Sequence, residues 1–276
     1  SSTINFLNKL AILKRSTTSS KVIAITGSSG KTTLKTLLGK TLSEYGKTYF
    51  SQKSYNNHIG VPLSLCNLEN DHRYGVFEIG MSNSGEIRKL SNLVKPNIAI
   101  ITNIGEAHIE NFDNLNSIAK AKSEIIENIS KDGHIILNRD DKYFNYLSKI
   151  AKKKNINILS FGKSNKSNAK LIKKKLYKNY TSLNIKVLDK NIFLKVKHVN
   201  SLIIYNILST LLTLHILDLD LTKLINFSNN FQLVEGRGKI YHVSRYKKNF
   251  KLIDESYNAN PSSVKNAINN FSNIKR

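Results

Sequence analysis

The 276-residue sequence is poor in cysteine, proline and long apolar runs, and each shortage excludes a class of protein. Its single cysteine, Cys66, cannot form an internal disulfide, which is typical of proteins in a reducing compartment. The most apolar stretch, residues 201–221, is interrupted by Asn206 and His215, so we interpret it as a buried helix and not as a membrane span. No charged segment leads into an apolar one at the start, so we see no signal peptide and expect a cytoplasmic protein.

Acidic residues are scarce as well. The sequence has 43 Lys and Arg against 19 Asp and Glu, which gives a formal net charge of +24. Such an excess suits nucleic acid, anionic lipid or an acidic substrate. Lysine dominates, and its clusters at residues 152–154 and 173–175 lack interleaved aromatic side chains. We therefore interpret the charge as a solvated surface spread over the whole chain, with no nucleic-acid partner. A basic nucleic-acid-binding protein is the alternative.

Strand-like and helical patterns alternate along the first 160 residues. Strands are expected at residues 21–26, 74–79, 97–102 and 134–137, and helices at residues 31–45, 117–129 and 141–154. This alternation predicts an α/β fold in which helices flank a mostly parallel sheet. Short alternating segments then predict antiparallel hairpins, and a pair of helices follows, at residues 169–197 and at residues 200–217 and 221–229.

A glycine-rich turn around Arg237 predicts a hinge, because Gly236 and Gly238 flank that residue. After it, the pattern strand, strand, helix begins a second α/β unit of Rossmann-like type, over residues 240–243, 250–253 and 261–271. This second unit is too short to form a whole domain.

A phosphate-binding loop is the strongest local signal. An apolar strand enters a glycine turn that opens a helix, with the sequence Gly27-Ser28-Ser29-Gly30-Lys31-Thr32-Thr33. Such a turn points free backbone N–H groups and a helix N-terminus at a phosphate. Lys31 would neutralise the terminal phosphates and Thr32 would hold Mg²⁺. The general pattern has another glycine where Ile25 stands, so this is a shortened variant; an ordinary glycine turn is the alternative.

Two further side chains follow strands and fall on the same sheet edge. Glu78 ends the strand at residues 74–79, and a carboxylate oxygen there suits Mg²⁺. His108 follows the next strand and is a candidate second metal ligand, with a lone surface histidine as the alternative. Lys120 and Lys122, taken by spacing alone, read as solvated lysines.

Taken together, six blocks in this order resemble the Mur ligase family: residues 25–33, 56–62, 78–81 with 85–87, 107–108, 119–122 and 254–261. The Asn-Asn-x-x-Gly-Val-Pro and Ser-Tyr-Asn-Ala-Asn-Pro blocks favour family members that add D-alanyl-D-alanine to UDP-N-acetylmuramoyl-tripeptide. The alternatives are a folylpolyglutamate-type or cyanophycin-type ligase, or a shortened nucleotide-binding remnant without turnover.

The resemblance also implies a domain organisation. Residues 1–20 would be a linker or helix from an N-terminal domain that this sequence lacks. Residues 21–235 would form the central ATP-binding ligase domain, and residues 236–276 would begin a C-terminal ligase domain. The family further implies a monomer that uses ATP and two Mg²⁺ ions.

By family analogy, ATP phosphorylates the terminal carboxylate of the tripeptide and the dipeptide amine then displaces phosphate. The resemblance assigns catalytic roles to Lys31, Lys122 and His108. It assigns metal binding to Thr32, Glu78, His108 and Lys122. Lys122 matches a lysine that is carbamylated in relatives, with Lys120 as the alternative register.

The remaining site residues also follow from the family pattern. Asn56 and Asn57 match a substrate loop. ATP contacts are implied for the phosphate loop from Gly27 to Thr33 and for Asn206, Arg237, Asp254, Tyr257 and Asn258. One departure weakens the contact to the base: relatives carry Gly-x-His-Asn-x-x-Asn where this chain has Leu202 and Ile203 before Asn206.

Overall fold

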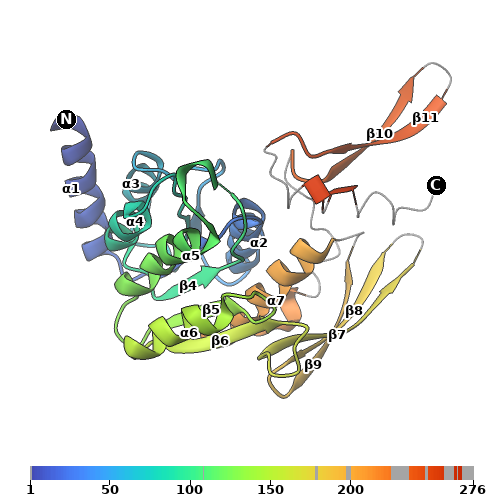
Figure 1. Cartoon of the computed structure of the whole chain (residues 1–276). Helices are drawn as coiled ribbons and strands as arrows, with labels where there is room; N and C mark the ends of the chain where they lie inside the picture. Colours follow the sequence, from blue (N-terminus) through green and yellow to red (C-terminus); the bar gives the residue numbers. More distant parts are fainter. Residues whose placement is uncertain are drawn as a thin grey trace.

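The computed structural model describes residues 2–107, 109–177, 180–196, 200–224, 236–245, 248–257, 264–265 and 267–268. Within them one mixed sheet of nine strands forms the frame of the molecule (Figure 1). Six strands are parallel: β1 (Lys21–Thr26), β2 (Thr48–Phe50), β3 (Tyr74–Glu78), β4 (Ile98–Ile101), β5 (His134–Asn138) and β6 (Asn157–Gly162). Three more continue the sheet as antiparallel hairpins: β7 (Ala169–Leu176), β8 (Thr181–Val187) and β9 (Lys190–Val196).

The strand order is β2-β3-β1-β4-β5-β6-β7-β8-β9. Seven helices are described, and together they cover both faces of the sheet. Between parallel strands lie α2 (Lys31–Ser43), α3 (Gly60–Cys66), α4 (Glu86–Val94), α5 (Leu115–Ser123) and α6 (Phe144–Lys153). Before the first strand lies α1 (Ser2–Thr17), and after β9 lies α7 (Ser201–Ile216). Short 3-10 segments are η1 (Ile109–Asn111) and η2 (Glu124–Asn128). Among the described residues, no helix combines the length and the apolar character needed to cross a membrane.

Two apolar cores hold the sheet between its helices, because successive side chains of a strand point to opposite faces. In β1, Ile23 and Ile25 pack toward α2 and α7, whereas Val22 and Ala24 pack toward α3 and α4. All four side chains are fully buried. A strand buried on both sides reads as a continuous apolar run, and this is the pattern that made β1 recognisable in the sequence.

A separate ribbon follows the main sheet. Its strands are β10 (Lys239–Arg245) and β11 (Lys248–Asp254), which pair antiparallel only with each other among the described residues. Gly236 and Gly238, with φ of 71° and 89°, make the turn before β10 in the left-handed region that glycine tolerates.

The α/β prediction and its main strands are confirmed. The helix expected over residues 117–129 is wrong as one continuous element, because α5 ends at Ser123 and the chain continues as the 3-10 segment η2. The helix expected at residues 221–229 is described only at residues 222–224. The helix expected at residues 261–271 lies largely outside the described residues.

Candidate active site

The turn between β1 and α2 is shaped by two glycines. Gly27 and Gly30 have φ of 144° and 83°, which other residues rarely adopt. A Cβ placed on Gly27 would lie 1.9 Å from the Thr102 Oγ1 atom, so a side chain there requires the loop or the end of β4 to move. Gly30 is the N-cap of α2 and provides no side-chain cap. The first N–H groups of α2 therefore remain available to an anion at the mouth of the loop.

Hydrogen bonds to the end of β4 fix the loop before any ligand binds. The Ser28 and Ser29 amides donate to the main-chain and side-chain oxygens of Asn103, both at 3.0 Å. The Thr102 hydroxyl donates to the Ser29 carbonyl at 2.7 Å. A loop held this way is preorganised, and its amides keep their direction without help from the ligand.

Lys31 lies over the loop. Its ammonium donates to the Gly27 carbonyl at 2.9 Å. Burial lowers the pKa of Lys31, while the nearby Glu78 carboxylate opposes that shift and Arg237 adds to it. A half-buried cation beside the free amides at the start of α2 is an arrangement that favours a polyphosphate.

Oxygen side chains gather beside the loop, where β3 ends. The Thr32 hydroxyl donates to the Glu78 carboxylate at 2.8 Å and lies 3.0 Å from the Ser54 hydroxyl oxygen. The Asn56 amide donates to the other carboxylate oxygen of Glu78 at 2.7 Å. Hydroxyl and carboxylate oxygens are the donors that Mg²⁺ prefers, so this group of residues fits a magnesium ion.

Lys122 is buried in the structure, with 2% of its surface exposed. The reading of Lys122 as a solvated lysine is therefore wrong, whereas Lys120 is exposed as expected. Burial lowers the pKa of Lys122 well below its usual value, and the charge of Lys31 lowers it further. The lowered pKa raises the share of the neutral Lys122 amine, which is the nucleophilic form. The predicted ligand His108 lies outside the described residues.

The phosphate loop opens into a cavity of about 300 Å³. Asn56, Asn57 and Glu78 line one wall, and the first turns of α7 line another. The Asn206 amide there donates to the Gly30 carbonyl at 3.3 Å, so it supports the loop from the side. Leu202 and Ile203, one turn earlier in α7, present apolar side chains to the cavity.

The segment around Arg237 closes the cavity from the far side. The Arg237 guanidinium lies 4.1 Å from the centre of the Tyr257 ring. The Asp254 carboxylate accepts from the Gly236 amide at 2.9 Å and so holds the turn before β10. Among the described residues, the buried Arg237 Nε has no hydrogen-bond partner, and such an unsatisfied donor facing a cavity suits an anionic ligand. The predicted contact Asn258 lies outside the described residues.

Sequence reasoning missed Lys35, which is fully buried on α2. Its ammonium donates to the Ser51 hydroxyl at 3.1 Å and to the Lys53 carbonyl at 2.8 Å. These bonds hold the segment that carries Ser54 to the phosphate loop. A signal was present in the sequence, because Lys35 lies three residues before the apolar Leu38 and shares its side of the helix.

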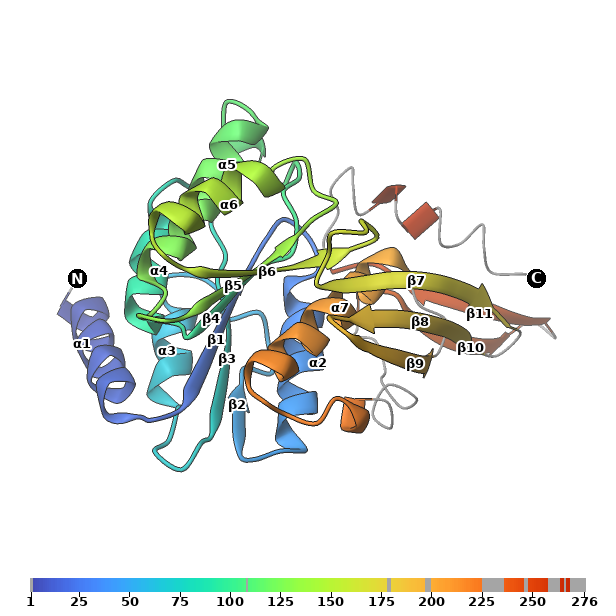
Figure 2. The ribbon, with the colours of Figure 1, turned by 90° about the horizontal axis from the view of Figure 1, so that it is seen from below.

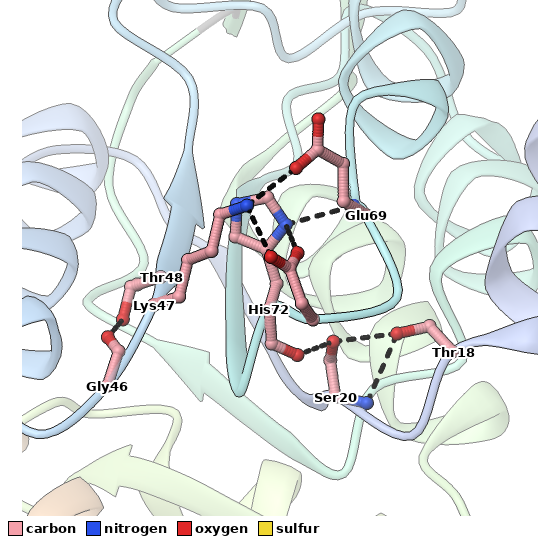
Figure 3. Close-up of polar contacts among 8 residues, drawn as sticks. Thr18, Ser20, Gly46, Lys47, Thr48, Glu69 and His72 are labelled. Carbon is pink, nitrogen blue, oxygen red and sulfur yellow. Dashed lines mark hydrogen bonds and ion pairs between the residues drawn. The ribbon is translucent and has the colours of Figure 1, made fainter.

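A second group of potential metal ligands lies at the opposite end of β3. Glu69, Asp71 and His72 bring one ligand atom each within 4.8 Å of one another. The Lys47 ammonium contacts both carboxylates at 2.7 Å (Figure 3). The His72 Nδ1 atom accepts from the Glu69 amide at 2.9 Å. The Lys47 ammonium already occupies the space between the two carboxylates, so we interpret this cluster as a surface ion-pair network.

Known proteins resemble this chain over most of its length. The family model of the Mur ligase middle domain matches residues 25–214. A UDP-N-acetylmuramoyl-tripeptide–D-alanyl-D-alanine ligase of Rickettsia prowazekii is 37% identical over 263 residues, covering 95% of this chain and 58% of the relative. The enzyme of that name from Buchnera aphidicola (subsp. Acyrthosiphon pisum) is 40% identical over 181 residues, covering 66% and 37%. The chain thus spans about half the length of these curated relatives.

Solved structures agree with the sequence matches. Crystal structure I of MurF from Acinetobacter baumannii superposes with a TM-score of 0.90 at 30% identity, covering 98% of this chain and 58% of that one. The MurF ligase of Thermotoga maritima, solved in complex with ADP, gives a TM-score of 0.84 at 28% identity, covering 97% and 60%. The fold described above is therefore shared with these proteins.

Proposed function

The chain belongs to the Mur ligase family, and we propose that it carries the ATP-dependent centre that joins D-alanyl-D-alanine to UDP-N-acetylmuramoyl-tripeptide. The observation that carries this proposal is the cavity between the phosphate loop and Arg237, where buried cations face a carboxylate and hydroxyl group suited to Mg²⁺. The names of the relatives support the choice of substrates, since the Rickettsia and Buchnera proteins are named for this reaction.

The proposed reaction has two steps. A carboxylate oxygen of the tripeptide attacks the γ-phosphorus of ATP, the bond to the β-phosphate oxygen breaks, and ADP leaves. The amine of the dipeptide then attacks the acyl carbon, phosphate leaves with the bonding electrons, and the amine gives up a proton. The first step transfers a phosphoryl group between anions and the second releases a phosphate anion, so the contribution required of the protein is positioning and charge stabilisation.

The phosphate loop supplies the stabilisation in this scheme. The free amides at the start of α2 and the Lys31 ammonium would contact the phosphates of ATP, while hydrogen bonds to Asn103 and Thr102 hold the loop in place. Thr32 and Glu78 would hold Mg²⁺, which neutralises phosphate charge when it is bound. Arg237 would reach the same phosphates from the far side, since its Nε atom lies unsatisfied at the cavity among the described residues.

Lys122 is proposed to become carbamylated. A neutral amine adds to CO2 by forming a nitrogen–carbon bond and losing a proton, and the lowered pKa of Lys122 favours that neutral form. The product carries a negative charge where the lysine would carry a positive one, which relieves its repulsion from Lys31. Lys120 is exposed and lacks this environment, so the geometry favours Lys122. His108 stays a proposed ligand by family analogy alone.

The remaining residues of the site are proposed to bind the tripeptide and the nucleotide. Asn56 and Asn57 line the cavity beside Glu78 and are proposed to meet the tripeptide. Asn206 and Tyr257 are proposed to flank the nucleotide, and Asp254 to hold the turn that presents Arg237. Asn258 keeps its proposed ATP contact from the family pattern. The domain boundaries at residues 20 and 235 are likewise proposals.

The test is product analysis with competing amines. The chain is incubated with ATP, Mg²⁺ and UDP-N-acetylmuramoyl-tripeptide, with D-alanyl-D-alanine or with L-glutamate, and the products are identified by mass spectrometry. We expect a pentapeptide product with the dipeptide and none with glutamate. Ligation of glutamate would contradict the proposal and favour a folylpolyglutamate-type activity. ATP binding without any ligated product would favour a nucleotide-binding remnant.

A further inference from the structure

A large part of the net charge lies in one stretch of the chain, beside the positive charge that is spread over the rest of the sequence. Residues 163–197 contain eleven lysines and a single acidic residue, Asp189. This stretch of 35 residues thus carries +10 of the total of +24. It contains no arginine.

The stretch folds into β7, β8 and β9, which form the end of the main sheet (Figure 2). The inner face of these strands packs against α7, and its residues Leu183, Ile185 and Leu194 are fully buried. The strand register places every second residue on the opposite, outer face. We call this outer face the basic sheet face; its lysines are Lys170, Lys173, Lys175, Lys186 and Lys195.

An apolar side chain projects from the same face. Phe193 pairs with Asn184, which pairs with Lys173, so the ring lies in the same row across the sheet as one lysine. Each of the two neighbouring rows on this face contains two more lysines. Its surface is 65% exposed. Ile172, at the irregularity in the pairing of β7, is 47% exposed. Exposed apolar groups among lysines suit a partner that offers both anionic charge and an apolar layer.

The two tyrosine rings near this face are poorly placed to stack on nucleic-acid bases. Tyr177 and Tyr180 stack on each other, with ring centres 4.5 Å apart and an angle of 15° between the planes. Lys175 lies 5.1 Å from the centre of the Tyr177 ring, and Lys195 lies 5.6 Å from that of Tyr180. Single-stranded nucleic acid needs open ring faces, and arginine is the usual residue for bidentate phosphate contacts.

We propose that the basic sheet face binds an anionic phospholipid surface, with the lysines over lipid phosphates and Phe193 in the headgroup layer. Lysine stems can lie along apolar surface while their ammonium groups reach the phosphates. Each lysine near such a surface strengthens binding about fivefold at moderate salt. The candidate active site is lined by α7 on the other side of these strands, so binding through the outer face leaves the cavity open.

The test is sedimentation of the chain with vesicles, which requires neither ATP nor substrates and is therefore independent of the proposed ligase activity. Vesicles of phosphatidylcholine are compared with vesicles containing one third phosphatidylglycerol. The test variant carries Lys173→Gln, Lys175→Gln and Lys186→Gln. The matched control carries Lys152→Gln, Lys153→Gln and Lys154→Gln, which removes the same charge from exposed positions at the end of α6.

We expect binding to the anionic vesicles alone, reduced roughly 100-fold in the test variant and far less in the control. Phe193→Ser should weaken binding by a factor that changes little with salt, whereas the effect of the lysines should fade as salt rises. Circular dichroism checks that each variant is folded. Equal losses in both triple variants would overturn the proposal, since binding would then depend on total charge. So would absent vesicle binding together with salt-dependent binding of single-stranded DNA that the test variant loses.

Discussion

At the scale of single residues, the half-buried Lys31 and the buried Lys35 and Lys122 have three different environments. Lys31 contacts the loop carbonyl of Gly27, Lys35 contacts the segment after β2, and Lys122 lies beside Lys31 in an apolar setting. Burial is the main cause that lowers the pKa of all three side chains. Because burying a cation is costly unless it is paired, each of these lysines lowers stability, and Lys31 is the one placed to contact an anionic ligand at the loop.

Lys122 provides a test of this cost. Its pKa is lowered in the folded chain, so between that pKa and the ordinary value of about 10.4 the unfolded chain binds more protons. Stability therefore rises with pH through this window, and the full cost of burying the lysine is present below it. We expect Lys122→Met to raise the melting temperature at pH 7 in buffer free of bicarbonate. The gain should shrink as the pH approaches 10, and turnover should be lost.

The measurement is thermal unfolding of both proteins from pH 6 to pH 10, followed by circular dichroism. Lys120→Met serves as the control, because Lys120 is exposed on the same helix. A lower melting temperature of Lys122→Met at pH 7 would contradict this account of Lys122.

Lys35 is expected to position the segment between β2 and α3. Its ammonium donates to Ser51 and to the Lys53 carbonyl, and hydrogen bonds to a charged group contribute about 1.5–3 kcal/mol each. Lys35→Met should therefore speed hydrogen exchange of the Tyr55 and Asn56 amides by at least about tenfold. Mass-spectrometric exchange measures this directly. Lys40→Met on the exposed side of α2 is the control, and unchanged exchange in Lys35→Met would show that the segment is held otherwise.

At the scale of elements, a buried carboxylate holds the start of α4. Glu124 accepts from the Gly85 amide at 2.8 Å and from the Arg88 amide at 3.0 Å, although it lies in η2 and far along the chain. Glu124→Ala should cost about 2 kcal/mol, because it leaves N–H groups at the helix N-terminus without a partner. Glu127→Ala, which removes the exposed pair with Arg88, should cost less than about 1 kcal/mol. Urea unfolding of both variants measures the two costs, and equal values would refute the capping role.

The elements that could be predicted are those whose apolar pattern is complete in the sequence. β1 is buried on both faces and α7 is apolar almost all round, so each could be recognised without its neighbours. β2 has only three residues and α3 only seven, which is too short for a periodic pattern to emerge. The break between α5 and η2 depends on packing against α4, which the sequence pattern of one helix does not contain.

The same limit applies to predicting the residues of the candidate active site from the sequence. The glycine loop and Glu78 could be predicted because parallel strands run in one direction, which brings their carboxyl ends to the same edge of the sheet. The burial of Lys122 could not, because it depends on how α5 packs in the folded chain. Lys35 was missed because it is not part of a motif; its position on the side of Leu38 indicates burial, and its contacts to Ser51 and Lys53 show what it holds.

At the scale of the whole molecule, the sheet carries two separate surfaces. The cavity at the ends of the parallel strands gathers the phosphate loop, the end of β3 and the turn before β10. The three antiparallel strands present five of the eleven lysines of residues 163–197 on the face turned away from α7. The parallel part of the sheet thus forms the candidate active site, and the antiparallel extension forms the basic sheet face.

The central claim is that the glycine loop and Lys31 bind the phosphates of a magnesium nucleotide, and calorimetric titration with ATP tests it most directly. The chain is titrated with ATP in the presence of Mg²⁺ and in the presence of EDTA, beside Lys31→Ala and the exposed control Lys40→Ala. We predict one saturable site in the wild type and in Lys40→Ala. Affinity should fall by at least about tenfold without Mg²⁺ and by about 100-fold in Lys31→Ala, since a charged contact is worth several kcal/mol in a buried site. Undiminished ATP binding by a folded Lys31→Ala variant would contradict the account.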